Sequence, residues 1–153
     1  MRPALQLSTR AALAAALAVA LAQWIGLAYP IYAMIAAVIV TDLDPAQTRT
    51  LALTRVAGTA LGVILGAVMS LYLPHGPIAI GVAIFVAMFL AHLLGRKDAA
   101  RLAGYGCALV ILGYSNDPWT YAFFRFVETL LGIGVALALS AIPKLMREPD
   151  APR

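Results

Sequence analysis

The stretch "TRVAGTALGVILG" (Thr54–Gly66) places one arginine, Arg55, in an apolar run in which glycine recurs every fourth residue. The stretch "FRFVETLLGIG" (Phe124–Gly134) places a second arginine, Arg125, in a similar setting 70 residues later. An arginine at the centre of a membrane helix costs about 2.5–3.5 kcal/mol on insertion scales. Both arginines therefore need an explanation, which depends first on whether these runs lie in a membrane.

The composition of the chain indicates a membrane protein. Of its 153 residues, 63% are hydrophobic and 12% are charged, and the mean hydropathy is +0.90. A soluble domain carries about 25% charged residues, so this chain has too little polar surface to cover a water-exposed globule. Its apolar runs are long and continuous rather than alternating, which favours helices over a β-barrel. The predicted fold class is therefore an all-α integral membrane domain.

The same composition argues against several classes of function. The net charge of +4 comes from basic residues scattered singly between apolar runs, so it does not indicate a nucleic-acid partner. The single cysteine, Cys107, offers no disulfide and no metal-ligand spacing. The chain also has no catalytic triad, phosphate loop or pair of lumenal carboxylates, so we expect neither an enzyme nor a cofactor.

Six apolar runs predict six transmembrane helices, since about 20 residues cross a bilayer. Four of the runs begin at a proline, which suits the first turn of a helix. Asp44 and Asp117 precede two of these prolines and are expected to cap the helices. The predicted six-helix domain covers residues 1–143, and residues 144–153 form a short cytoplasmic tail. The six spans lie near Leu7–Ala28, Pro30–Val40, Pro45–Leu73, Pro77–Leu94, Ala99–Tyr114 and Pro118–Ile142.

The distribution of basic residues predicts the orientation. With a cytoplasmic N-terminus, the outer turns near Tyr29, His75 and Asn116 contain no lysine or arginine, as the positive-inside rule requires. We therefore expect a multi-pass protein of a bacterial-type inner (plasma) membrane with both termini in the cytoplasm. A signal peptide cleaved near Ala20–Ala22 is the alternative for the first span, but its removal would leave an odd number of spans. The aromatic belt expected near the outer interface includes Trp24, Tyr29, Trp119 and Tyr121.

A short pattern, R-x3-T-x2-G, occurs twice in the sequence with an offset of 70 residues. Because the repeating unit would contain three helices, its two copies must cross the membrane in opposite directions. Inverted repeats of this kind are typical of transporters whose substrate site lies near the midplane. The alternative is coincidence between segments rich in alanine, glycine and leucine. The predicted repeats cover residues 7–73, with Arg55, Thr59 and Gly62, and residues 77–142, with Arg125, Thr129 and Gly132.

The charges near the two arginines differ between the copies. Glu128 follows Arg125 by three residues on the same helical face and can neutralise it, whereas Gly58 occupies the matching position after Arg55. One positive charge is then left over, and a guanidinium can hold a carboxylate through two hydrogen bonds. The alternative is structural, with Arg55 bound to backbone carbonyls or joined to Glu128 in a closed triad.

The small and hydroxylated residues of the same helices leave two interpretations open. Thr59 and Thr129 lie one turn beyond the arginines and can bind either a substrate or the carbonyl four residues back. The glycines permit close packing between helices, or they leave room for a pore. The glycines concerned are Gly58, Gly62 and Gly66 in the first copy and Gly132 in the second.

The stretch "YPIYAMIAAVIV", a short polar loop and "TRTLALTRVAGTALGVILGAV" together resemble the membrane module of the fusaric acid resistance and aromatic acid exporter superfamily. The stretch "FRFVETLLGIGVALALSAI" resembles the sixth helix of that module, and plant aluminium-activated malate transporters are more distantly similar. The resemblance implies a six-helix module that exports organic anions, often aromatic carboxylates. The residues that match the third helix are Arg55, Gly58, Thr59 and Gly62, and those that match the sixth are Arg125, Thr129 and Gly132.

The resemblance also shapes the functional expectation. Familiar members carry a soluble domain or a second membrane module, so we expect this chain to act as a homo-oligomer, with a dimer as the first choice. The expected function is a membrane exporter or channel for small organic anions, with Arg55 as the main anion contact. The alternative is a non-transporting accessory or assembly subunit whose glycine stripes bind a larger partner. Cation transport fits poorly because the buried charge has the wrong sign.

Overall fold

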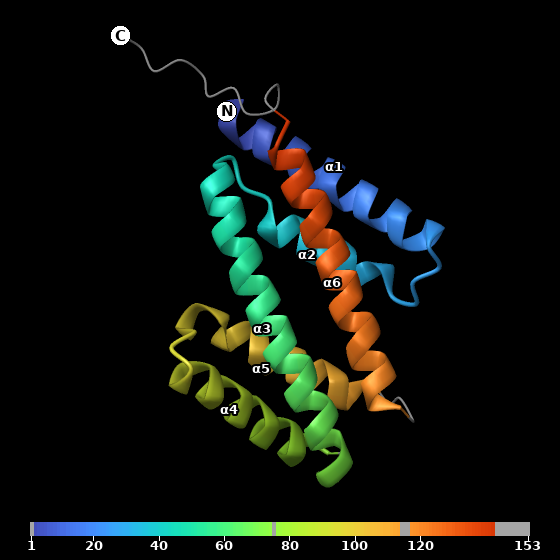
Figure 1. The fold of residues 1–153 in the computed structure, drawn as a ribbon, viewed down its shortest axis with the longest axis vertical. Coiled ribbons are helices and arrows are strands. Elements are labelled where there is room, and N and C mark those ends of the chain that lie inside the picture. Colours follow the sequence, from blue (N-terminus) through green and yellow to red (C-terminus); the bar gives the residue numbers. More distant parts are fainter. Residues whose placement is uncertain (1, 75, 114–116, 143–153) are drawn as a thin grey trace. The chain divides into compact units, whose positions relative to one another are not determined.

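The computed structural model describes residues 2–74, 76–113 and 117–142, which form six α-helices and one short 3-10 helix (Figure 1). The described residues contain no β-strand, so the all-helical prediction is confirmed. The predicted tail, residues 144–153, lies outside the described residues. The helices are α1 (Arg2–Trp24), α2 (Pro30–Val40), α3 (Pro45–Tyr72), α4 (Pro77–Leu93), η1 (Lys97–Ala99), α5 (Ala100–Leu112) and α6 (Pro118–Ser140).

Helices α3 and α6 begin where the Asp-Pro pairs predict. The Asp44 carboxylate accepts a hydrogen bond from the backbone N–H of Ala46 at 2.9 Å. The Asp117 carboxylate accepts hydrogen bonds from the hydroxyl of Thr120 and from the backbone N–H groups of Thr120 and Trp119. These bonds, led by that of the Thr120 hydroxyl, lower the pKa of Asp117 below its ordinary value of 3.8. Both predicted caps are therefore confirmed.

One glycine with a positive φ ends the first helix of each predicted half. Gly26 has a φ of 72° after α1, and Gly95 has a φ of 71° after α4. In each case the next residue donates its N–H to a carbonyl five positions back, Leu27 to Ala22 and Arg96 to Ala91, both at 2.9 Å. Helix α1 thus ends at Trp24 and not at Ala28, because this turn stops the helix inside the apolar run.

Among the described residues, three helices are long and apolar enough to cross a membrane, namely α1 from Ala4, α3 and α6. The others are shorter, with 11 residues in α2, 17 in α4 and 13 in α5. At 1.5 Å per residue, α2 is only about 16 Å long, about half the hydrocarbon thickness of roughly 30 Å. The structure therefore has six helices as predicted, while six complete crossings remain a prediction.

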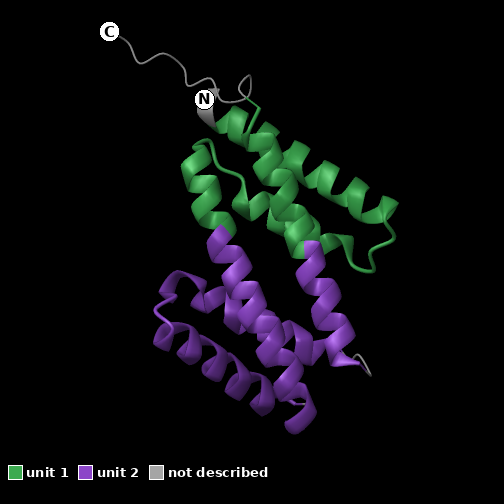
Figure 2. Cartoon of the chain, viewed as in Figure 1, with its two compact units in different colours: residues 1–52, 129–153 green, residues 53–128 purple. Residues whose placement is uncertain are grey.

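The chain divides into two compact units, residues 1–52 with 129–153 (unit 1) and residues 53–128 (unit 2), as Figure 2 shows. In unit 1, α1 packs against α2, and the C-terminal part of α6 covers them. In unit 2, α4 packs against α5, and α3 covers them. Each unit therefore combines a helix pair from one predicted half with the third helix of the other.

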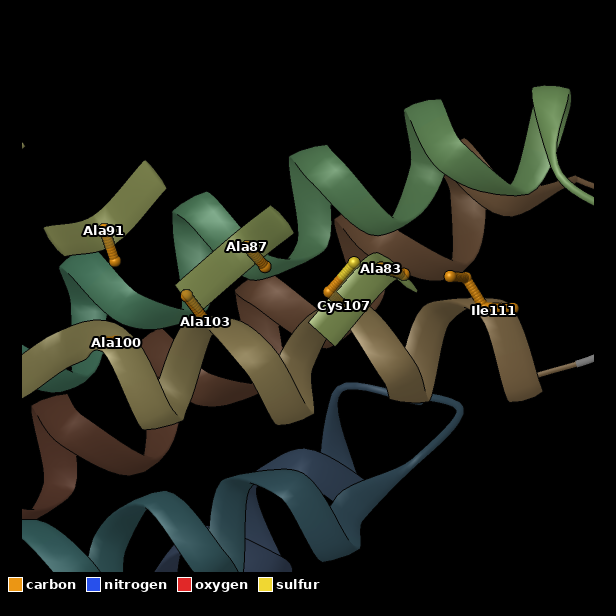
Figure 3. Close-up of a cluster of buried hydrophobic side chains, with 7 residues drawn as sticks. All are labelled: Ala83, Ala87, Ala91, Ala100, Ala103, Cys107 and Ile111. Carbon is orange, nitrogen blue, oxygen red and sulfur yellow. The ribbon is translucent and has the colours of Figure 1, made fainter. Parts of the chain in front are cut away.

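Alanine dominates both cores and lets the helices approach closely. In unit 2 the alanines of α4 recur every fourth residue and face α5 (Figure 3). The buried cluster of unit 1 consists of Ala14, Ala18, Ala22, Ala33 and Ala37, and that of unit 2 consists of Ala83, Ala87, Ala91, Ala100, Ala103, Cys107 and Ile111.

Candidate functional site

The charged residues predicted to lie inside the membrane are buried. Arg55 on α3 is 1% exposed, and Arg125 and Glu128 on α6 are 2% and 0% exposed. All three belong to unit 2, although they come from helices far apart in the sequence. Side chains buried to this extent are not solvent-exposed anchors at the ends of the helices.

Both guanidinium groups approach the ring of Tyr105 on α5. The Cζ atom of Arg55 lies 5.3 Å from the ring centroid, and that of Arg125 lies 6.0 Å from it. The π-electrons of a tyrosine ring attract a cation at such distances, more strongly where water is excluded. One ring thus partly offsets two buried positive charges.

The N–H donors of Arg55 make no hydrogen bond within the described part of the chain. Its Nε, Nη1 and Nη2 atoms are buried and have no hydrogen-bond acceptor among those residues. Within the described residues, therefore, no backbone carbonyl and no carboxylate oxygen of Glu128 accepts a hydrogen bond from Arg55, as the structural alternative would require. Buried donors without acceptors are costly, and a guanidinium in this state is suited to bind an anion.

Tyr105 was missed by reasoning from the sequence. The visible signal is the stretch "GYGC" (Gly104–Cys107), in which a polar aromatic residue stands between two glycines inside an apolar run. Periodicity alone could not assign Tyr105 to the arginines, because they belong to two other helices. The tertiary packing of α3, α5 and α6 supplies that information.

The glycines of α3 lie directly against the backbone of α5. A Cβ atom at Gly62 would lie 2.6 Å from the carbonyl oxygen of Ala103, and one at Gly66 would lie 2.8 Å from that of Cys107. A Cβ atom at Gly58 would also collide with α5. These are the contacts of close helix packing, and they hold Tyr105 near Arg55.

The other residues predicted for the site belong partly to unit 1 and partly to unit 2, and they are also buried. Thr59 is 3% exposed and belongs to unit 2, and Thr129 is 0% exposed and belongs to unit 1. Gly132, also in unit 1, lies against the backbone carbonyl of Ala33 on α2, with no room for a methyl group. A substrate-binding role for the two threonines remains a prediction.

Two polar residues lie deeper than the sequence suggests. Arg10, expected as a flanking charge, is 3% exposed and donates hydrogen bonds to the carbonyls of Asp42 and Leu43 at 3.2 and 3.1 Å. Arg10 therefore holds the loop between α2 and α3 against α1. Tyr121, expected in the aromatic belt, is buried because its ring packs against Gly113 at the end of α5. Trp24 and Trp119 are exposed as expected.

A wholly apolar groove of about 240 Å³ lies between α3 and α6 in unit 2. It contains no polar surface, which distinguishes it from the arginine–tyrosine cluster. The lining residues are Ala60, Val63, Ile64, Trp119, Ala122, Phe123 and Phe126.

Comparison with known proteins identifies the family. Residues 17–139 match the model of the fusaric acid resistance protein-like family. The chain belongs to this family. The resemblance inferred from the third and sixth helices is thereby confirmed, and membership together with the apolar helices indicates a multi-pass membrane protein.

Among curated relatives, proteins of Mycobacterium bovis and Mycobacterium tuberculosis carry the name "Putative arylamide transporter". Each is 32% identical over 117 residues, which cover 72% of this chain and 32% of the relative. The chain thus spans about a third of the length of the curated relatives it matches. No solved structure matches the chain.

Proposed function

We propose that this member of the fusaric acid resistance protein-like family is an exporter or channel for small organic anions, including aromatic carboxylates, and works as a homo-oligomer in the inner membrane. The observation that carries the proposal is Arg55, a fully buried guanidinium with no acceptor in the described part of the chain. Transport as such is also supported by the name of the mycobacterial relatives.

The charge balance of unit 2 favours an anion with one negative charge. Its buried charged side chains, among the described residues, are Arg55, Arg125 and Glu128. The sum is one positive charge, which a single carboxylate neutralises. In a medium of low polarity, an uncompensated charge is expensive, so binding an anion would relieve that cost.

Reciprocal glycine contacts support the inverted repeat. Gly62 packs on the carbonyl of Ala103 in unit 2, and Gly132 packs on the carbonyl of Ala33 in unit 1. The two glycines are 70 residues apart, and so are the two alanines. Each half therefore uses the same glycine to pack its third helix on the second helix of the other half.

The two cores repeat in the same way. The partly buried residues that α3 places on the core of unit 2 correspond, with an offset of 70, to those that α6 places on the core of unit 1. Such a correspondence is what two copies threaded in opposite directions would give. The equivalent pairs are Leu61 and Leu131, Leu65 and Val135, and Met69 and Leu139.

The proposal is tested by flux through purified protein in proteoliposomes loaded with 4-hydroxybenzoate. Arg55→Ala should reduce efflux to the level of empty liposomes, and Arg55→Lys should retain part of it, because lysine keeps the charge without the two-pronged geometry. Arg101→Ala is the matched control, since Arg101 is an exposed arginine on α5. Efflux by Arg55→Ala at the rate of the unaltered protein would refute the proposal.

The proposed homo-oligomer has its own test. The apolar groove between α3 and α6 offers a surface for the helix of a second copy. Phe123 lines this groove and is 64% exposed, so Phe123→Trp should weaken association by altering the shape of the groove. Light scattering of the purified protein should give at least twice the monomer mass. A monomer that still transports would refute this part, and inert protein that co-purifies with a larger partner would favour an accessory subunit.

A further inference from the structure

We propose that Tyr105 is a third member of the anion site, so that its hydroxyl donates a hydrogen bond to the anion that Arg55 holds. This inference rests on the proposed function, since it concerns the same site. In addition, the Tyr105 ring offsets the charge of the two guanidinium groups when no anion is bound. Tyr105 is thus a specificity-determining residue, which selects anions that accept a strong hydrogen bond.

The hydroxyl of Tyr105 is in the same unusual state as Arg55. The oxygen is buried and has no hydrogen-bond partner in the described part of the chain. A buried phenol normally finds an acceptor, because leaving its O–H unpaired is costly. The guanidinium of Arg55 and the hydroxyl of Tyr105 are both hydrogen-bond donors. They belong to the two residues that the cation–π contact joins. A shared acceptor with a negative charge would satisfy both groups.

The two glycines beside Tyr105 hold it between the neighbouring helices. A Cβ atom at Gly106 would lie 3.5 Å from the Cα atom of Gly62 on α3, and one at Gly104 would lie 2.9 Å from the side chain of Met88 on α4. The backbone around Tyr105 is therefore packed closely on both sides. A residue fixed in this way can present its hydroxyl with little loss of entropy on binding.

The Tyr105 ring stabilises the two buried guanidinium groups when no anion is bound. Arg55 and Arg125 both lie within about 6 Å of the ring centroid, which is the range of a cation–π contact. Without the ring, two buried cations would share a site with Glu128 as the single buried acid among the described residues. An arriving anion takes over part of this role of the ring, and it need not break a salt bridge of Arg55 to do so.

The test compares Tyr105→Phe with the unaltered protein. The substitution keeps the ring and removes the hydroxyl, so benzoate should bind about tenfold more weakly, as expected for the loss of a hydrogen bond to a charged group. Thiocyanate, a weak acceptor, should bind within about twofold of its original affinity. Both affinities are obtained from the anion-dependent rise in melting temperature of the purified protein. Tyr72→Phe, at an exposed tyrosine of α3, is the matched control and should change neither affinity.

The melting temperature without anion separates this role from a structural one. Because the hydroxyl has no acceptor among the residues that the structure describes, Tyr105→Phe should melt at the same temperature as the unaltered protein or higher. Tyr105→Leu, which also removes the ring, should melt at a lower temperature. Lower stability of Tyr105→Phe would show that the hydroxyl has a partner in the fold and would overturn the inference.

The outcomes also distinguish the inference from the proposed function. If Tyr105→Phe binds benzoate as tightly as the unaltered protein while Arg55→Ala does not bind it, the inference fails and the proposed function stands. If Arg55→Ala binds benzoate with unchanged affinity, the proposed function itself fails. Weak benzoate binding with unchanged thiocyanate binding in Tyr105→Phe supports both.

Discussion

At the scale of single residues, few polar side chains lie inside unit 2, and each has a distinct role. Arg55 brings a guanidinium whose donors have no hydrogen-bond acceptor among the described residues, and Tyr105 brings a ring and a hydroxyl. Glu128 is the single buried acid in that part of the chain. In a medium of low polarity, each unit of charge in such a set changes the preferred ligand strongly. The identity of residue 128 should therefore set the charge of the anion.

Glu128→Gln should shift the preference from singly to doubly charged anions. The substitution raises the buried charge from one to two, so uptake of malate relative to benzoate should rise by at least about tenfold. Competition between the two labelled anions in proteoliposomes measures this ratio. Asp98→Asn, at an exposed acid of η1, removes the same charge outside the site and should leave the ratio unchanged. An unchanged ratio in Glu128→Gln would exclude Glu128 from the site.

At the scale of helices, glycine contacts decide where the functional side chains lie. Gly58, Gly62 and Gly66 bring α3 against the backbone of α5, which carries Tyr105. A methyl group at this contact meets backbone atoms, which cannot move aside as the end of a side chain could. A substitution at Gly62 should therefore displace Tyr105. A substitution at a glycine with open space beside it should not.

Gly62→Ala should destabilise the protein by about 1–3 kcal/mol, as overpacking of a core does, because the new Cβ atom would lie 2.6 Å from the Ala103 carbonyl. Gly134→Ala on α6 is the control, since no atom lies within 4 Å of its added Cβ atom. That variant should be neutral or up to about 1 kcal/mol more stable through helix propensity. Thermal unfolding in detergent compares the two. Equal stability of both variants would contradict the observed packing.

At the scale of the whole molecule, the sequence predicts the helices well and their partners poorly. Prolines, the caps Asp44 and Asp117 and the apolar runs located the six α-helices of the described residues, because these signals are local. Arg55 and Arg125 lie within apolar runs of the sequence, and both are buried. The contact of Tyr105 with the arginines and the hydrogen bonds of Arg10 to the loop between α2 and α3 could not be predicted. Both depend on contacts between distant segments.

The crossing of the membrane by the shorter helices is a prediction at this scale. Gly76 precedes α4 and Arg96 follows it, and the charge distribution assigns them to the outer and inner sides. In a Cys107→Ser background, Gly76→Cys should react with an impermeant maleimide added outside intact cells. Arg96→Cys should react only after the membrane is opened. Labelling of both cysteines from the same side would mean that α4 does not cross.

Whether Arg55 binds a transported anion can be measured by electrical recording. Purified protein in a planar bilayer is exposed to gradients of 4-hydroxybenzoate, malate or chloride. We expect a current carried by anions that disappears in Arg55→Ala and persists in Arg101→Ala. A current of unchanged size in Arg55→Ala, or a current carried by cations, would contradict it.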